Sequence, residues 1–225
     1  MKIWSDGHRF GALSCVRTKS ANAKTGDMAQ LSILPVRMTA TDAIKRKKDN
    51  IICGDCPLRA SVGGSCYVNP VSYNAPQRAY AAQPVQDVPT IDKPLRLGAY
   101  GDPAFLPMDK LSELVDRSNG HTGYTHQWHK VAPDYSALLM ASIDHIDNGE
   151  TREKAKDLGY RTFRILKYGD RLETGEILCP NSTKGITCAQ CKLCAGTSTG
   201  ARDIAIYGHG APSKTKAFFN GSVKH

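Results

Sequence analysis

Cysteine is the residue whose type and spacing in this sequence are best suited to chemistry. Seven of the eight cysteines fall into two groups, and the eighth, Cys15, stands alone. A chain inside a cell keeps its thiols reduced, so clustered cysteines indicate metal binding rather than disulfides. We expect Cys15 to be a small buried apolar residue.

The C-terminal group contains four cysteines, three of them spaced C-x2-C-x2-C. Its predicted metal ligands are Cys179, Cys188, Cys191 and Cys194. This spacing suits a [4Fe–4S] cluster, in which each thiolate binds a different iron. Zinc sites more often use two separated C-x2-C pairs. We therefore favour an iron–sulfur cluster, with one tetrahedral Zn²⁺ as the alternative.

The N-terminal group contains three cysteines, Cys53, Cys56 and Cys66, spaced C-x2-C-x9-C. Three thiolates on a [4Fe–4S] cluster leave one iron open to bind a substrate or a cofactor. Alternatively, a histidine or a cysteine of the other group completes a zinc or cluster site. Whether the chain has one or two metal sites stays open at this point.

Positive charge is concentrated at the two ends of the sequence. The net charge is +9, and residues 1–60 hold 11 Lys and Arg against 5 Asp. This asymmetry indicates an anionic partner, either nucleic acid or a nucleotide, although solvated surface lysines are an equally good explanation. The densest patch, Lys45–Lys48, has no interleaved aromatic residues, so base stacking is not expected there.

The length and the apolar runs indicate a single domain away from the membrane. The chain has 225 residues, enough for one domain with at most a small added module. No apolar run approaches the roughly 20 residues of a membrane span, and the N-terminus lacks the pattern of a signal peptide. We expect a soluble cytosolic protein, and nothing in the sequence indicates its oligomeric state.

Strand and helix patterns alternate along most of the chain, which predicts an α/β fold. The strands are expected at residues 11–16, 31–36, 95–100, 122–128, 137–143, 160–166, 176–178 and 203–207. The helices are expected at residues 38–48, 76–82, 108–118 and 151–158. We predict a mostly parallel sheet or a partial (βα) barrel with two cysteine-rich metal-binding loops. Residues 1–92 would form an N-terminal segment packed on the same core as an α/β domain at 93–225.

Polar side chains follow several of these strands. Ligands of parallel α/β folds bind beyond the carboxyl ends of the strands. We predict catalytic roles for Asp102, His126 and His209 and cofactor binding by Asp102 and Asp144; His145 follows the same strand as Asp144. The second cysteine group is expected at the same rim. The alternatives are ordinary hydrogen-bonded histidines and, for Asp102, a turn aspartate before a proline.

A resemblance covers nearly the whole chain. It rests on the segments NAKTG (22–26), ICGDCP (52–57), GSCYVN (64–69), LGAYGDP (97–103), TGYTHQW (122–128), MAS (140–142), YRTFR (160–164) and YGHG (207–210). In this order they resemble a family of uncharacterised proteins of tailed bacteriophages. The resemblance implies a phage-encoded protein in the host cytoplasm and implies no activity.

The N-terminal cysteines also resemble those of radical S-adenosylmethionine enzymes. Those enzymes carry three cysteines after the first strand of a βα barrel, and the next strand ends in a Gly-Gly-Glu-Pro-like motif that holds the methionine amino group. Here Cys53, Cys56 and Cys66 precede a strand that ends in Tyr100-Gly101-Asp102-Pro103. The resemblance implies that Asp102 orients S-adenosylmethionine and that the C-terminal cysteines hold an auxiliary cluster. The usual loop of those enzymes is C-x3-C-x2-C, and their adenosine-binding motifs are not evident here.

Three hypotheses for function follow. We favour an iron–sulfur metalloprotein, with a radical-type enzyme as the form that the second resemblance implies. The main alternative is a zinc-stabilised protein that binds nucleic acid or a host factor through its basic ends. The third is a hydrolase or transferase that uses His126, His129, His209, Asp102 and Asp144 as acid–base groups or metal ligands. The G-x-S-x-G, Walker A and H-E-x-x-H motifs are absent.

Overall fold

The chain forms a mixed α/β fold with two five-stranded sheets. The computed structural model describes residues 1–7, 11–20, 22–144, 151–209 and 212–219. The first sheet has the order β1 (Lys2–Ser5), β2 (Ala12–Arg17), β3 (Ala29–Pro35), β4 (Leu95–Tyr100), β5 (His121–Thr122). The second has the order β6 (Tyr124–Thr125), β7 (Met140–Ile143), β8 (Thr162–Leu166), β10 (Asp203–Tyr207), β9 (Glu176–Leu178).

Most of the strands run in one direction. Strands β1, β2 and β3 pair antiparallel, whereas β3, β4 and β5 pair parallel and every pairing in the second sheet is parallel. The single residue Gly123 separates β5 from β6, so the two sheets follow one another along the chain. Within the described residues no pairing joins the outer edges into a closed barrel. The predicted α/β fold with a mostly parallel sheet is confirmed.

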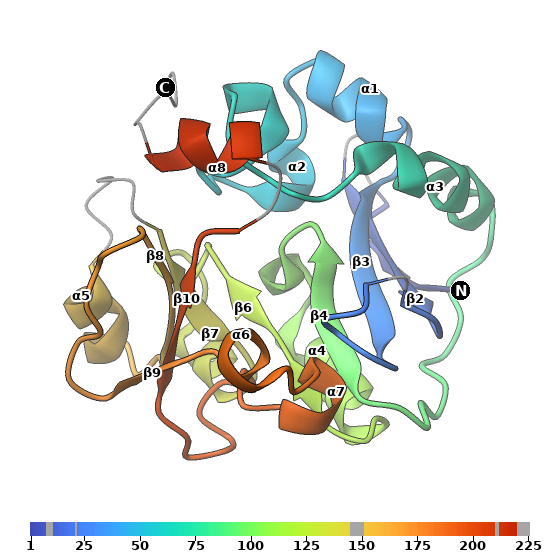
Figure 1. The fold of residues 1–225 in the computed structure, drawn as a ribbon. Helices are drawn as coiled ribbons and strands as arrows, with labels where there is room; N and C mark the ends of the chain where they lie inside the picture. The colour runs from blue at the N-terminus through green and yellow to red at the C-terminus, as the bar shows by residue number, and fades with distance from the viewer. Residues whose placement is uncertain (8–10, 21, 145–150, 210–211, 220–225) are drawn as a thin grey trace.

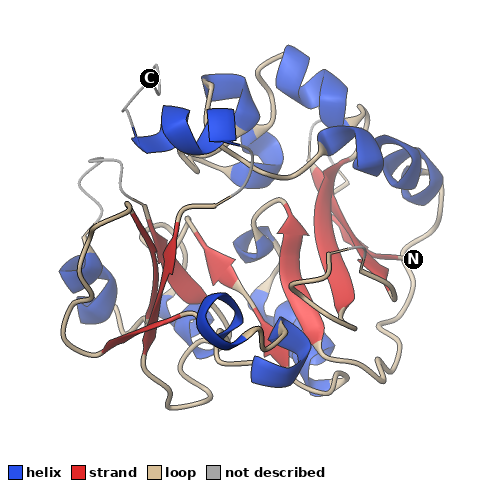
Figure 2. Cartoon of the chain, in the orientation of Figure 1, coloured by secondary structure: helices blue, strands red, loops and turns tan. Residues whose placement is uncertain are grey.

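Helices cover both ends of the sheets. They are α1 (Ala40–Lys45), α2 (Asn50–Cys53), α3 (Asn74–Ala81), α4 (Met108–Asp116), α5 (Arg152–Asp157), α6 (Pro180–Lys184), α7 (Cys188–Cys191) and α8 (Pro212–Phe219). Figure 1 shows α1, α2, α3 and α8 above the carboxyl ends of the parallel strands and α7 at the opposite end. Figure 2 shows the same helical cover over the strand ends. No helix of the described ranges has the length and apolar character needed to cross a bilayer.

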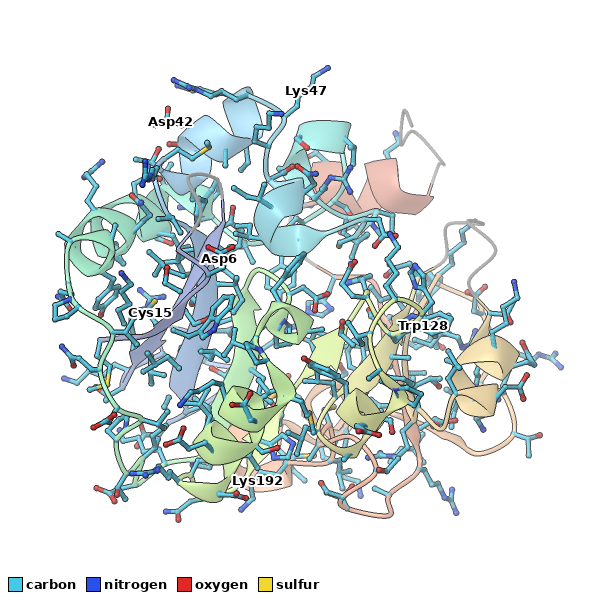
Figure 3. The ribbon with its side chains drawn as sticks, turned by 180° about the vertical axis from the view of Figure 1, so that it is seen from behind. Asp6, Cys15, Asp42, Lys47, Trp128 and Lys192 are labelled. Carbon is cyan, nitrogen blue, oxygen red and sulfur yellow. The ribbon has the colours of Figure 1, made fainter. Side chains whose placement is uncertain are left out.

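One main hydrophobic core unites the two sequence segments. It contains Leu13 and Leu31 from the first segment together with Leu95, Leu111 and Leu139 from the second. The first sheet also draws strands from both sides of the expected boundary at residue 92, so that boundary does not divide the sheets. A smaller core surrounds the buried Trp128, which Figure 3 shows on the opposite side of the molecule from Cys15.

Cys15 is buried, as predicted. Its exposed fraction is 0%, and burial raises the pKa of its thiol to about 11. A thiol with this environment is protonated at neutral pH and behaves as an apolar side chain.

Two expected strands differ from the observed ones by three residues, and three others differ by one or two. The strand expected at 122–128 divides at Gly123, whose N–H donates to Cys194 and which bridges to Ala195, and it ends at Thr125. A Cβ at Gly123 would lie 2.8 Å from the Cβ of Leu97, so this crossing requires glycine. The strand expected at 137–143 begins only at Met140, since residues Pro133–Ala137 form a 3₁₀ turn.

A charged network joins β10 to β8 and to helix α5 in the second sheet. The carboxylate of Asp203 accepts hydrogen bonds from the backbone N–H of Thr162 at 3.0 Å and from Arg152 at 2.7 Å, and Lys156 lies 3.0 Å away. Burial raises the pKa of Asp203, but these interactions outweigh burial and hold the pKa below its ordinary value.

Replacing Asp203 with Asn tests this network. We expect Asp203→Asn to lower the free energy of unfolding by about 2 kcal/mol at pH 7, because charged hydrogen bonds are lost. The contribution of the native carboxylate is present above its unfolded pKa of about 3.9 and disappears as pH falls through the lower folded pKa. Urea unfolding from pH 7 to pH 2.5 should therefore show the two proteins converging in acid. The matched control is the exposed Asp157, where Asp157→Asn should change little; a constant difference at all pH values would contradict the assignment.

Candidate functional site

The N-terminal cysteine loop starts at the end of α2. Cys53 is the last residue of that helix, and Gly54 follows with a φ of 58°. The backbone N–H of Cys56 donates to the carbonyl of Cys53 at 3.2 Å, which turns the loop sharply. A Cβ at Gly54 would lie 2.3 Å from the side-chain amide of Gln127, which itself donates to the Cys53 carbonyl at 3.3 Å. Glycine therefore allows residue 127 to support the turn.

The loop then folds back and returns Cys66 to its start. The backbone N–H of Cys66 donates to the carbonyl of Leu58 at 2.8 Å, and that of Gly64 donates to Arg59 at 3.1 Å. A Cβ at Gly64 would lie 2.4 Å from the carbonyl carbon of Leu58. Only glycine permits this approach of two backbone segments.

A buried aspartate fixes the middle of the loop. Asp49 accepts a hydrogen bond from the backbone N–H of Ser61 at 3.0 Å and another from the Ser61 hydroxyl. Arg59 lies 3.6 Å from Asp49 and donates to the carbonyl of Gly54 at 2.9 Å. Both arms of the loop are thus held by one ion pair and its hydrogen bonds.

The three thiols of this loop interact electrostatically. Burial raises the pKa of Cys53 well above its ordinary value, and Cys56 and Cys66 raise it further. The nine-residue spacing therefore closes in space, and the loop brings Cys66 within electrostatic range of Cys53.

The C-terminal group is held by backbone hydrogen bonds to distant segments. The N–H of Cys179 continues the sheet by donating to Ala205 at 2.8 Å. Helix α7 begins with a capping box between Thr187 and Gln190. The N–H of Cys188 donates to Lys24 at 3.1 Å, so the helix docks beside the turn that precedes β3.

Cys194 lies in the most tightly held part of this group. Its carbonyl accepts from the N–H of Gly123 at 2.7 Å. Arg161 donates to the carbonyls of Leu193 at 2.9 Å and Gly196 at 2.6 Å, on both sides of Cys194. Burial raises the pKa of Cys194, and three further thiols raise it in the same direction, namely Cys179, Cys188 and Cys191. All four cysteines of this group thus lie in mutual electrostatic range.

The cysteine thiols of the described residues do not form a metal site in this structure. All eight cysteines are free thiols. Across the described ranges, no three or more His, Cys, Asp or Glu side chains form a group that could hold a metal ion. Metal binding by the two loops accordingly stays a prediction.

Most of the second cysteine group lies at the opposite end of the parallel strands from the first group, and the expectation of a shared rim is wrong for that part. The N–H of Asp102, after β4, donates to Ile52 in α2 at 2.7 Å, which places the first group at the carboxyl ends. Helix α7 contacts residues before β3, and Arg161, which precedes β8, bonds beside Cys194, so this part of the second group lies at the amino ends. Cys179 differs, because it directly follows β9. Figure 3 shows Lys192, which follows α7, at the opposite end of the molecule from Lys47. The reason is that the chain turns back after β9 instead of continuing along the rim.

Asp102 links the ends of β4 and β6. Its buried carboxylate accepts hydrogen bonds from the N–H of Ala104 at 3.0 Å, the hydroxyl of Thr125 at 2.7 Å and the N–H of His126 at 2.8 Å. Burial raises the pKa of Asp102 despite these bonds and the nearby His126. These contacts are those of a turn aspartate before Pro103, which is the alternative interpretation of Asp102. A role of Asp102 in cofactor binding stays a prediction.

His126 and Asp144 form a largely buried ion pair at this rim. Nε2 of His126 lies 2.8 Å from Oδ2 of Asp144, and its ring interacts with Cys56. Burial lowers the pKa of His126, but Cys56 and Asp144 outweigh it and hold the pKa well above its ordinary value. Oδ1 of Asp144 is buried without a hydrogen-bond partner among the described residues. A buried carboxylate oxygen in this state is suited to receive a donor from a ligand.

The remaining histidines occupy different surroundings. His129 lies 3.3 Å from Asp55, between two cysteines of the first loop, and packs edge-on against Trp128. His209 stacks on Tyr67 with ring centroids 6.4 Å apart, and its Nδ1 lies 3.1 Å from the Tyr207 carbonyl oxygen. The structure thus brings His126 and Asp144 together beside Cys56, and it places His209 against Tyr67, at the other end of the first loop. His145 lies outside the described residues.

Sequence reasoning did not single out the residues that hold both loops. Arg59, Arg161 and Gln127 act through backbone carbonyls, and no spacing rule marks such contacts. Glycine at positions 54 and 64 was the available signal.

Comparison of this chain with protein-family models, with curated proteins and with solved structures finds no match.

Substitution at Gly64 tests the closure of the first loop. Gly64→Ala should expel the loop from its observed path, because the new methyl group would overlap the Leu58 carbonyl. The neighbouring Gly63 has a φ of 78° and open space around it, so Gly63→Ala should cost only about 1 kcal/mol from backbone strain. We expect Gly64→Ala to cost at least about 1 kcal/mol more and to accelerate hydrogen exchange at the Cys66 amide. Equal effects of the two substitutions on exchange would contradict the observed path.

Proposed function

We propose that this chain is an iron–sulfur protein whose reaction takes place at the carboxyl ends of the parallel strands. The observation that carries the proposal is the clustering of seven cysteines in two groups of three and four. The thiols of each group influence the pKa of Cys53 or of Cys194, which supports their proximity. Closure of the first loop is supported by the close glycine contacts at positions 54 and 64 and by the Arg59–Asp49 ion pair.

The donor chemistry of both sets suits iron–sulfur clusters. Thiolate sulfur is the usual protein ligand of such clusters. Burial and mutual repulsion disfavour thiolates at Cys53 and Cys194 without a cation nearby, and a bound metal reverses this preference. Since the described side chains are not yet arranged around a metal ion, binding would include a rearrangement of the thiols.

The rim residues would serve the open coordination position of the three-cysteine set. A cluster held by three thiolates supplies one iron that can bind a substrate or cofactor, with S-adenosylmethionine as the expected class. Asp102 fixes the backbone of His126 through its hydrogen bonds and acts as a positioning residue. His126 and Asp144 would hold or move a proton beside Cys56, and Oδ1 of Asp144, which has no hydrogen-bond partner among the described residues, would accept a ligand donor.

Metal analysis of protein purified without oxygen tests the proposal. We expect absorption at about 400 nm and about four iron and four sulfide per occupied group. The triple replacements C53A/C56A/C66A and C188A/C191A/C194A should each remove the iron bound by the group that is replaced and leave the iron of the other group in place. The matched control is Cys15→Ala, which lies in the apolar core and should keep all the iron at some cost in stability. Colourless protein that contains stoichiometric zinc would contradict the proposal.

A second candidate function is binding of nucleic acid by a zinc-stabilised protein. The observation that favours it is the exposure of Lys45, Arg46, Lys47 and Lys48 at the end of α1. Lys47 adopts a φ of 54°, and Figure 3 shows its side chain directed away from the body of the protein. Clustered exposed cations of this kind attract phosphate backbones.

Salt dependence tests this second candidate. Replacing the four residues with Gln should weaken binding to a short DNA duplex and lower the salt slope by up to about four. The control is Lys110→Gln, since Lys110 is paired with Glu113 at 2.8 Å. If the quadruple variant and the control bind alike at low salt, the basic patch is not a nucleic-acid site.

A further inference from the structure

A cation and four aromatic rings lie between the two cysteine groups and have no role in the proposed cluster chemistry. Arg96 is the second residue of β4, and the rings are those of Tyr67, Tyr124, Phe163 and His209. We refer to these five residues as the Arg96 site. They come from the first cysteine loop, β4, β6, β8 and the segment after β10.

Two phenols hold the guanidinium of Arg96. Its Nη2 donates to the hydroxyl of Tyr67 at 2.5 Å, and the hydroxyl of Tyr124 also lies within hydrogen-bonding reach. Tyr67 directly follows Cys66, and Arg96 interacts electrostatically with Cys188. The guanidinium therefore lies between the two thiol sets.

The positive charge of Arg96 is not matched by a carboxylate. Phenols are neutral at physiological pH, and in the described part of the chain no Asp or Glu forms an ion pair with Arg96. A guanidinium that is partly withdrawn from water without a counter-charge is costly. An anion bound at this position would remove that cost through forked hydrogen bonds.

The aromatic rings form two stacked pairs near the cation. Tyr124 and Phe163 stack with centroids 4.6 Å apart and an interplanar angle of 11°. Tyr67, which is 53% exposed, stacks on the exposed His209. Exposed aromatic surface beside a guanidinium matches a ligand that has a flat ring and an anionic group.

We propose that the Arg96 site binds a nucleotide, with its phosphate on Arg96 and its base against the aromatic rings. Base stacking on aromatic side chains and phosphate binding by arginine are the interactions that these residues offer. The site stands on contacts that do not involve metal, so it can be tested independently of the iron–sulfur proposal.

Calorimetric titration with guanosine 5′-monophosphate tests the site. Guanosine and inorganic phosphate are titrated separately. Guanosine has the base that would stack on the aromatic rings, and inorganic phosphate has the anion that would bind Arg96. We expect the nucleotide to bind at least about tenfold more tightly than either half, since one charged hydrogen bond is worth about 1.5 kcal/mol or more. Nucleotide binding no tighter than phosphate would reduce the site to a general anion contact and overturn the proposal.

Variants assign the two halves of the ligand. Arg96→Gln should weaken nucleotide and phosphate binding about tenfold or more and leave guanosine binding unchanged. Phe163→Leu should weaken nucleotide and guanosine binding but spare phosphate. The matched control is Arg37→Gln, at an exposed arginine far along the sequence from the site. Equal effects of Arg96→Gln and Arg37→Gln would overturn the proposal.

Two further measurements keep the result interpretable. Arg96→Lys retains the charge without the forked geometry and should show intermediate affinity, which guards against loss of folding in Arg96→Gln. Iron content is measured in every variant. If Arg96→Gln removes iron from the C-terminal group and leaves nucleotide binding intact, then Arg96 serves as a counter-charge for Cys188 and the nucleotide site is refuted. If the purified protein contains no iron and still binds the nucleotide, and if Arg96→Gln weakens that binding, the Arg96 site is supported although the iron–sulfur proposal fails.

Discussion

The close passage of Gly64 over the backbone of Leu58 is the constraint on which the functional architecture depends. It allows a loop that leaves helix α2 at Cys53 to fold back at Cys66, and the hydrogen bond from the Cys66 amide to Leu58 maintains that return. Tyr67 is carried to Arg96 by the same return, because it directly follows Cys66. One backbone contact thus positions a thiol of the first set and the phenol that holds the cation between the two sets.

Strand β4 connects the two ends of the molecule. Its beginning supplies Arg96, on the side of the C-terminal thiols, and the turn after it supplies Asp102, which holds His126 beside the first loop. In a parallel sheet the starts of all strands lie at one end and their carboxyl ends at the other. One strand can therefore supply side chains to a site at each end of the sheet. The proposed cluster chemistry at the carboxyl ends and the proposed nucleotide site would then share one rigid strand.

The sequence predicted the regular elements better than the site. The strands at 95–100, 176–178 and 203–207 have the expected bounds, because alternation of apolar and polar residues is a local signal. Cys15 is buried as expected. The location of the C-terminal cysteines depends on contacts between Cys188 and Lys24, more than 160 residues apart, and no local pattern encodes such contacts. Arg96 was overlooked although a charge between Leu95 and Leu97 in a strand was a visible signal.

Iron K-edge X-ray absorption on protein isolated without oxygen is the most direct measurement of whether these thiols hold clusters. The account predicts iron surrounded by sulfur, with a second shell of neighbouring iron that weakens when Cys53, Cys56 and Cys66 are replaced together. Iron bound only by oxygen and nitrogen, or a sulfur-bound zinc edge in its place, would contradict it.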